Sequence, residues 1–343
     1  MQDCTVHRRS LLSVVAALAM AAGGLATAQD VSLNYESLSS LEEPIAVEIG
    51  DVTLALTGLV DTSLIYDSED ESTDAVLLGN SQLTASTQLP NRWRVAVLYF
   101  GEYASGEGRV SGTEGRYSDN AAISVGGMWG TLLGGDVSGV VREQTRRLRG
   151  AGNASLAFDD FLAALEDRGG AYLVRLGPWV LGTVVDENGD FDLGAMFQRP
   201  GANRDYRLTM RYTDGVYTAA DGSVRYESRA TGVGGELIFG STSFDAAVGR
   251  EELSANRSRA IRRYLSSGIR TKLGVVGLSL EGHLGRVAGE YERSVALGLQ
   301  YDVARGLSVN LGLNYASARV TLDGASLLNT SDRSAAFSLR YSY

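Results

Sequence analysis

The sequence has very little of several residue types that mark particular classes of protein. Cys4 is the single cysteine, Lys272 the single lysine, His7 and His283 the two histidines, and only four of the 343 residues are prolines. One cysteine excludes an intramolecular disulfide, and so few Cys and His residues exclude a zinc site built from them. With a formal net charge of −10, the chain is a poor candidate for nucleic-acid binding. We expect no metal and no cofactor.

The chain also has only one long apolar run, which lies near its N-terminus. Arg8 and Arg9 precede an apolar stretch over 11–25, and Ala26-Thr27-Ala28 supplies a small-x-small cleavage site. Residues 1–28 are therefore predicted to be a secretory signal peptide. No later run approaches the roughly 18 residues of a membrane helix. Residues 29–50 show no clear pattern and are interpreted as an N-terminal lead-in.

The chain does contain an alternation of apolar and polar residues that continues to its end. Over 307–315 every second residue is Leu, Val or Tyr, and the residues between them are Ser, Asn or Gly. Such a period of two predicts β-strands with one apolar face. A soluble sandwich and a membrane barrel both alternate in this way. Tyrosines at strand ends, Arg and small residues on the polar faces, and connections that are short and long in turn favour an antiparallel transmembrane β-barrel over residues 51–343.

The short connections predict the number of strands. Seven of them are recognisable from Pro, Gly and Asn, at 89–91, 128–130, 177–178, 199–201, 240–242, 274–277 and 304–306. Seven short turns, with both chain ends on the same side of the membrane, imply 16 strands. Membrane strands of about 9–11 residues fit that number, with 14 and 18 strands as alternatives.

The segment 137–169 interrupts the strand pattern. Its second half, 155–168, is predicted to be a helix, because Phe158, Phe161, Leu162 and Leu165 fall on one helical face. A long loop inside an otherwise regular barrel indicates a functional element. We expect it to fold inward as a constriction loop, with an external lid as the alternative.

At this point the sequence resembles the Gram-negative general porins, which are trimeric 16-stranded outer-membrane channels. The resemblance lies in the first strand at 52–61, in the hairpin at 123–135, and in the alternating aromatic end at 337–343. It departs from the usual pattern in ending on Tyr343 and in lacking a Pro-Glu-Phe-Gly-Gly-type motif in the loop. The resemblance implies a homotrimer in the bacterial outer membrane, in contact with lipid and lipopolysaccharide, that passes small hydrophilic solutes and ions.

The candidate site residues are charged and are expected at the pore constriction. Strand parity directs Arg94 and Arg175 into the lumen, and the family's arginine cluster opposite an acidic loop implies a role for both and for Arg116. The loop separates its own charges, with basic residues first and acidic residues second. These are Arg142, Arg146, Arg147, Asp159, Asp160, Glu166 and Asp167. Rings of charge at a constriction set selectivity; the acidic chain favours weak cation preference, which the loop arginines would oppose.

Three other functions are weighed against a passive diffusion channel. The first is a substrate-selective channel with a solute site at the constriction. The second is a hydrolase borne on the barrel, because Ser279, Glu281 and His283 share one strand face, but residues two apart on a strand do not form a relay and no Gly-x-Ser-x-Gly elbow is present. The third is a soluble secreted β-protein. The acidic stretch 67–74 is interpreted as a solvated outer loop, with divalent cations bridging it to lipopolysaccharide as the alternative.

Overall fold

The structure is a computed structural model. It describes residues 45–68, 71–105, 117–147, 150–165, 168–201, 204–219, 222, 224–255, 258–322 and 324–343. The predicted signal peptide, most of the 29–50 segment, and Arg116, Glu166 and Asp167 therefore lie outside the described residues.

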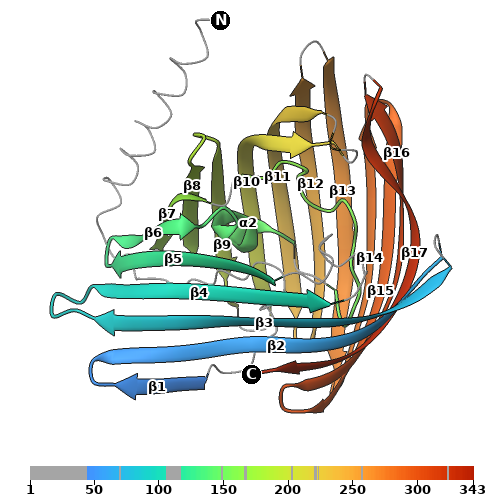
Figure 1. Cartoon of the computed structure of the whole chain (residues 1–343). Helices are drawn as coiled ribbons and strands as arrows, with labels where there is room; N and C mark the ends of the chain where they lie inside the picture. The colour runs from blue at the N-terminus through green and yellow to red at the C-terminus, as the bar shows by residue number, and fades with distance from the viewer. Residues whose placement is uncertain are drawn as a thin grey trace, which may run out of the picture.

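Sixteen strands, β2 to β17, form one closed antiparallel ring (Figure 1), in which each strand pairs with its neighbours in sequence and β17 pairs with β2. The predicted 16-stranded barrel is thus confirmed. The strands of the ring are β2 (Val52–Asp67), β3 (Ser72–Gln88), β4 (Arg94–Ser105), β5 (Tyr117–Gly127), β6 (Gly130–Asp136), β7 (Arg168–Leu176), β8 (Trp179–Asp186), β9 (Phe191–Arg199), β10 (Asp205–Thr218), β11 (Arg225–Phe239), β12 (Thr242–Ala255), β13 (Ser258–Leu273), β14 (Val276–Val287), β15 (Glu290–Ala304), β16 (Leu307–Leu322) and β17 (Ala325–Ser342).

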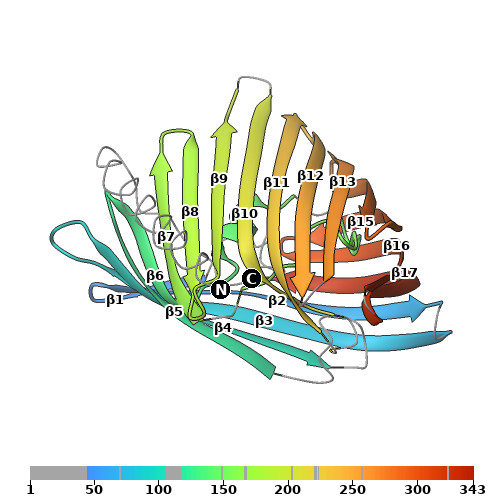
Figure 2. The same cartoon turned by 90° about the horizontal axis from the view of Figure 1, so that it is seen from above.

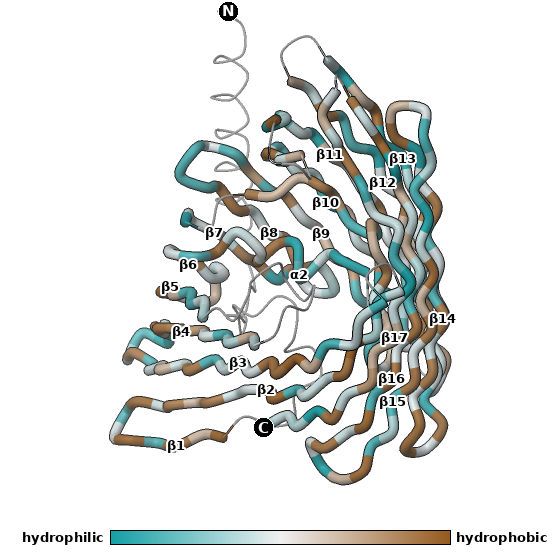
Figure 3. Tube along the Cα trace, turned by 45° about the vertical axis from the view of Figure 1, so that its right-hand side comes forward, coloured by the Kyte–Doolittle hydropathy of each residue, from teal (hydrophilic) through white to brown (hydrophobic). Residues whose placement is uncertain are grey.

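The alternation in the sequence becomes an outer apolar surface and an inner polar one. On β15 and β16, Leu297, Leu299 and Leu313 are 46, 38 and 46% exposed, whereas Ala296 and Asn310 on the other face are fully buried. Hydrophobic and hydrophilic residues alternate along strands such as β14 in Figure 3. Because successive side chains of a strand point to opposite faces, one parity faces outward around the whole ring.

An additional strand, β1 (Ile45–Ile49), pairs with β2 beside the chain's C-terminus. The backbones of Gly58 and Tyr343 exchange two hydrogen bonds of 2.9 Å, and Ile45 of β1 is paired with Leu56, two residues before Gly58. β1 therefore continues along the edge of β2 at the point where β17 ends.

The connections fall into two groups at opposite ends of the barrel. All seven predicted short turns join the strands as expected, which leaves the long connections at the other end. The longest described one follows β6 and carries a helix, α2 (Val140–Thr145). It runs inside the ring of strands, as Figures 1 and 2 show. Within the described residues, no helix has the length and apolar character needed to cross a membrane.

Candidate functional site: the loop inside the barrel

The loop that follows β6 first packs against the inner wall through apolar residues. Val137, Val140 and Val141 are buried with inward-facing residues of β4 to β8. A Cβ atom at Gly194 of β9 would lie 2.6 Å from Val141 Cγ1, so the absence of a side chain there lets α2 approach the wall. The helix is therefore positioned by an apolar patch of the wall and by glycine.

Beyond α2 the loop is fixed by a buried ion cluster at Arg147. Gly268 of β13 is flanked in register by Asp245 of β12 and Glu281 of β14. The Arg147 guanidinium bonds Asp245 at 2.5 Å, bonds Glu281, and lies 3.6 Å from Asp159 of the loop. Its side chain is only 3% exposed. Burial alone would lower the pKa of Arg147, but Glu281 and Asp245 raise it above its ordinary value.

The loop reaches its far point at Asn153, on the opposite arc of the ring. Asn153 Oδ1 accepts hydrogen bonds from Arg340 Nη2 at 3.2 Å and from Ser338 Oγ at 3.3 Å, both on β17. Arg340 also donates to Asp61 of β2 at 2.7 Å. The loop thus crosses the inner wall from β8 to β17. It is held there beside the pairing of β17 with β2, which closes the barrel.

On its return the loop is held by backbone hydrogen bonds to side chains of the wall. Ala157 N donates to Ser294 Oγ at 3.0 Å, and the amides of Leu162 and Ala163 donate to the Glu251 carboxylate at 3.1 and 2.8 Å. These amides are consequently not available for helical hydrogen bonds. The predicted helix over 155–168 is wrong: the described residues 155–165 are not helical, and the helix of the loop is α2 in its first half.

The helical spacing gave a wrong prediction because the apolar side chains at these positions pack into different clusters. Phe158 and Leu162 pack into one apolar cluster at the long-loop end of the barrel, whereas Phe161 packs with Tyr264 and Leu165 with the patch beneath α2. The apolar residues are therefore three and four positions apart in a segment that is not helical, and they pack against different parts of the wall.

Two arginines of the wall complete the ion network. Arg262 of β13 is fully buried, bonds Glu292 at 2.8 Å and Glu251 at 3.2 Å, and donates to the carbonyl oxygens of Phe158 and of Asp160, the latter at 2.7 Å. Because both carboxylates come from the wall, Arg262 has its remaining donors directed at the loop.

Arg211 of β10 connects the wall to the acidic half of the loop. It bonds Asp192 at 2.8 Å and Asp160 at 3.1 Å, and Arg142 of α2 bonds Asp160 at 2.6 Å. Burial opposes the negative charge of Asp160, but Arg211 and Arg142 outweigh it and hold the pKa of that carboxyl below its usual range. Asp160 is therefore an anion held between the helix and the wall.

Most of the candidate residues that the structure describes belong to this network. Arg147, Asp159 and Asp160 belong to the ion clusters just described, Arg142 bonds Asp160, and Arg146 bonds Glu143 at 2.7 Å. Arg94 and Arg175 have the inward parity but stand at the short-turn ends of β4 and β7, where Arg94 donates to Ser86 Oγ at 3.5 Å. The structure places these two apart from the loop's anchors.

The wall arginines that hold the loop were missed by the sequence reasoning. They are Arg207, Arg211, Arg262 and Arg340. Each has the parity opposite to its apolar neighbours, so their inward direction is readable from the sequence. Their contact with the loop is not, because it depends on where the loop lies along the wall.

One buried carboxylate of the wall has no hydrogen-bond partner among the described residues. Glu236 of β11 is 8% exposed, and neither of its carboxylate oxygens has a hydrogen-bond partner among the described residues. It is paired in register with Arg207 on one side and Asp245 on the other. These side chains line a pocket together with Gly234 and Gly235.

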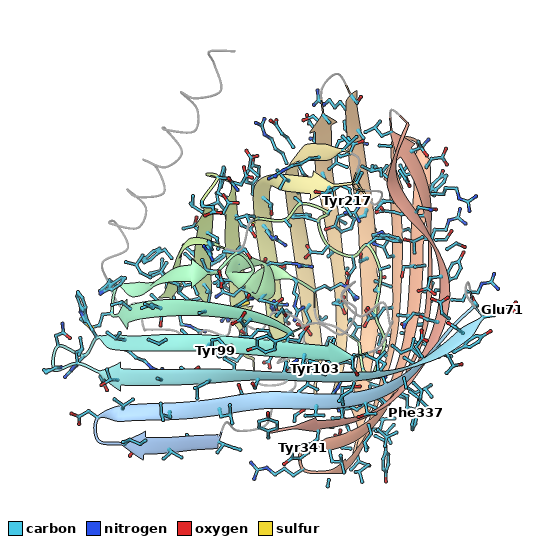
Figure 4. All side chains as sticks on the ribbon, in the orientation of Figure 1. Glu71, Tyr99, Tyr103, Tyr217, Phe337 and Tyr341 are labelled. Atoms are coloured by element: carbon cyan, nitrogen blue, oxygen red, sulfur yellow. The ribbon has the colours of Figure 1, made fainter. Side chains whose placement is uncertain are left out.

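An apolar cluster joins two hairpins across the long-loop end of the barrel. Tyr217 at the end of β10 donates to the carbonyl of Leu327 on β17 at 2.7 Å, although seven ladder steps separate the two strands. Figure 4 shows Tyr217 near the upper end of the barrel. Leu253, Val287 and Val320 are fully buried in the cluster, and Phe158 of the loop packs against it. This cluster thus covers the loop segment around Phe158 on the side of the long-loop end.

His283 has different neighbours from those considered in the sequence. Its ring nitrogens lie 2.8 Å from Ser266 Oγ and 3.0 Å from Glu292, whereas Ser279 accepts from Ala151 N and Glu281 binds the loop. Ser266 is fully buried and His283 is 2% exposed. Among the described residues, no group of three or more His, Cys, Asp and Glu side chains is arranged to hold a metal ion.

The architecture has clear structural relatives. The chain matches no protein-family model and no curated protein by sequence. An anion-selective porin from Comamonas acidovorans is similar with a TM-score of 0.62 and 14% identity, over 85% of this chain and all of that one. The outer membrane protein OmpT of Vibrio cholerae, in a trimer form, gives a TM-score of 0.64 and 14% identity over 85% and 99%. A mutant porin of Rh. blastica gives 0.53 and 12% over 84% and 100%. The fold of this chain is that of the 16-stranded porins.

Proposed function

We propose that the protein is an outer-membrane porin, a water-filled channel for passive diffusion of small hydrophilic solutes and ions. The observation that carries this proposal is a closed ring of sixteen strands with an apolar outer surface and a loop fixed to its charged inner wall. A closed ring leaves no unpaired strand edge in the hydrocarbon region, and exposed Leu and Val rows on the outside suit lipid.

The loop gives the channel its selectivity. Because it is fixed at Arg147, Asn153 and Asp160 to separate arcs of the wall, its position in the lumen is set by several independent contacts. Arg142, which is 43% exposed, and Asp159, which is 31% exposed, carry charge toward the lumen. Charges near a constriction bias which ions pass.

The protein is proposed to be a channel and not an enzyme. The trio of Ser266, His283 and Glu292 has the residue types of a hydrolase, but it is buried beneath the loop and Glu292 is paired with Arg262. A nucleophile needs an approach path for its substrate. We interpret the trio as part of the network that holds the loop. A homotrimer is proposed as well, because the trimer form of the Vibrio cholerae protein has the same fold.

Single-channel conductance of the refolded chain in a planar bilayer, with the reversal potential measured under a salt gradient, tests the function. Stepwise openings in groups of three are expected. A folded, inserted barrel without conductance would contradict a diffusion channel. Block of the current by one solute at saturating concentration would favour a substrate-selective channel instead.

A further inference from the structure

The end of the barrel at the short turns carries inward-facing arginines around its whole circumference. Strands β4, β7, β10, β13 and β17 each direct one arginine inward there, within four residues of the strand's end, and Figure 2 shows these strands spread around the barrel. The five residues are Arg94, Arg175, Arg207, Arg270 and Arg340. Successive members are three or four strands apart in the closed sheet. We call them the basic ring.

The acidic residues that face inward at the same end are less accessible than the ring. They are Asp61, Asp205, Glu236, Asp245 and Asp302. All five are buried or only half-exposed, and three of them are in ion pairs, with Arg340, Arg147 and Lys272. In contrast, Arg94, Arg175 and Arg270 are exposed. The accessible charge at this mouth of the barrel is therefore mainly positive.

The opposite mouth, at the long loops, has accessible charge of the other sign. The inward strand positions and the described connections there carry exposed or half-exposed carboxylates. These are Glu71, Asp74, Glu187, Glu290 and Asp332. Toward this end, the inward basic side chains of the described strands are Arg211 and Arg262, and both are buried in ion pairs. The two mouths of the barrel thus differ in sign.

Two mouths of opposite sign create an electric field along the channel. A cleft lined by one sign of charge raises the local concentration of counter-ions, and a potential of about one kT changes that concentration about threefold. Cations therefore gather at the long-loop mouth and anions at the basic ring. This field is distinct from the one that the loop creates, because the charges of Arg142 and Asp160 lie together at one level inside the barrel.

The sign of an applied voltage decides whether these ions fill or empty the channel between the mouths. When the long-loop side is positive, cations move inward from the acidic mouth and anions move inward from the basic ring. Both kinds of ion then accumulate in the middle of the channel, and its conductance rises. When the voltage is reversed, each kind is drawn back through the mouth that attracts it. The middle loses ions of both signs, and the conductance falls.

We propose that the channel rectifies ionic current, conducting better when the side of the long loops is positive. Arg94 and Arg175, which the sequence placed at the constriction, act in this proposal at the mouth with the short turns. Porin-type barrels direct their short turns to the periplasm, so the favoured current carries cations inward and anions outward. The proposal rests on the channel function proposed above and adds a direction to it.

Currents of single refolded channels, recorded at equal voltages of both signs in the same salt on both sides, test the proposal. At about 0.1 M salt, where charges are screened over about 10 Å, we expect the two currents to differ about two- to threefold. At about 1 M, where the screening length is about 3 Å, we expect the difference to disappear. The variant R94Q/R175Q/R270Q, which neutralises the exposed members of the basic ring, should conduct almost equally in both directions at either salt concentration.

Two further variants serve as controls. R250Q/R263Q/R286Q removes the same charge from exposed arginines on the outward face, so its rectification should match that of the wild type. Gln88→Cys reports the orientation of the inserted channel, because Gln88 faces inward beside Arg94 and the only natural cysteine is Cys4 in the predicted signal peptide. A bulky thiol-reactive polymer should lower its current only when added on the side of the short turns.

The outcomes separate this proposal from that of a channel. A folded, inserted barrel without current contradicts the channel itself, whereas equal currents of both signs from a conducting wild type at 0.1 M overturn only the rectification. Rectification that persists at 1 M, or that is equal in the ring variant and the wild type, would also overturn it. If the ring variant fails to fold, as heat-modifiable mobility on a gel would show, the single variant R175Q replaces it and should rectify less than the wild type.

Discussion

Arg147 of the loop and Gly268 of the wall share one position on the inner surface of the barrel. A Cβ atom at residue 268 would lie 2.6 Å from Arg147 Nη1, so the guanidinium occupies the space of the missing side chain. The carboxylates on either side, Asp245 and Glu281, then meet it from the two neighbouring strands. The loop is attached where the wall combines a gap with two negative charges.

Gly268→Ala is expected to displace this anchor. The neighbour at 2.6 Å is a guanidinium confined by two carboxylates, so it cannot move aside without breaking their ion pairs. We expect larger and noisier single-channel currents, since part of the loop would leave the wall. Gly282→Ala on the adjacent strand is the matched control, because a Cβ there meets nothing within 4 Å. Identical currents from both variants would mean that Arg147 does not fix the loop.

Arg147→Gln removes the charge from the same anchor. Removing one partner of a buried ion pair typically costs about 3–5 kcal/mol, because the remaining charges are left uncompensated. Here the remaining charges are Asp245 and Glu281, which are 8 and 4% exposed. We expect lower thermal stability and a cleavage site for protease within the loop. The variant Arg147→Gln/Glu281→Gln should recover part of the loss, and no recovery would argue against direct coupling of these two residues.

The sequence predicts the barrel well because the alternation within each strand can be recognised from that strand alone. The alternation that separates Leu297 and Leu299 from Ala296 is local, and so are the turns at 177–178 and 240–241. The path of the loop is not local. Arg262 donates to a carbonyl more than a hundred residues away at Phe158, and no short-range pattern contains that relation. The helix predicted over 155–168 failed for the same reason, since the wall supplies the hydrogen bonds that a helix would otherwise make.

The many inward glycines have a similar explanation. Their number suggests strands, but the sequence does not show why they stand where they do. In the structure Gly194, Gly232 and Gly268 lie beneath Val141, Phe161 and Arg147 of the loop. The glycines therefore follow the path of the loop, which becomes visible only when strands far apart in the sequence are placed in register.

Glu236→Gln is expected to reduce the preference of the channel for cations. Glu236 is the carboxylate without a hydrogen-bond partner in the described residues, and it lines the pocket beside Arg147 and Arg207. Its charge is therefore not neutralised by direct contact. The reversal potential under a salt gradient should move toward that of an anion-preferring channel. Glu227→Gln, on the outward face of the same strand, should leave it unchanged; equal shifts in both variants would assign the effect to total charge.

Tyr217→Phe tests the contact between the two hairpins at the long-loop end. The change removes the hydrogen bond to Leu327 and leaves the ring in its apolar cluster. A hydrogen bond of this kind contributes about 1 kcal/mol, or about a fivefold change in an opening equilibrium. Transitions between conductance levels should become correspondingly more frequent. Tyr301→Phe, exposed on the outside of β15, is the control. Unchanged transitions would show that the apolar cluster alone holds the hairpins together.

Acidification is expected to release the return pass of the loop through Asp160. Its pKa in the folded protein lies below the ordinary aspartate value of about 3.9, chiefly because Arg211 and Arg142 outweigh the effect of burial. A lowered pKa means that the carboxylate stabilises the fold above the ordinary value and that this contribution is lost as the pH falls through the folded value. Current fluctuations of the open channel should therefore stay low at neutral pH and rise in the acid range below about pH 4.

The variant Asp160→Asn separates this effect from general acid unfolding. Without the carboxylate, Arg142 and Arg211 lose their shared partner, although Arg211 keeps its bond to Asp192. We expect Asp160→Asn to fluctuate already at neutral pH and to change little on acidification, whereas Asp214→Asn, at an outward-facing carboxylate, should behave like the wild type. Asp160 lies between the helix and the wall. If the acid response persists in Asp160→Asn, another ionisable group of the network is responsible for it.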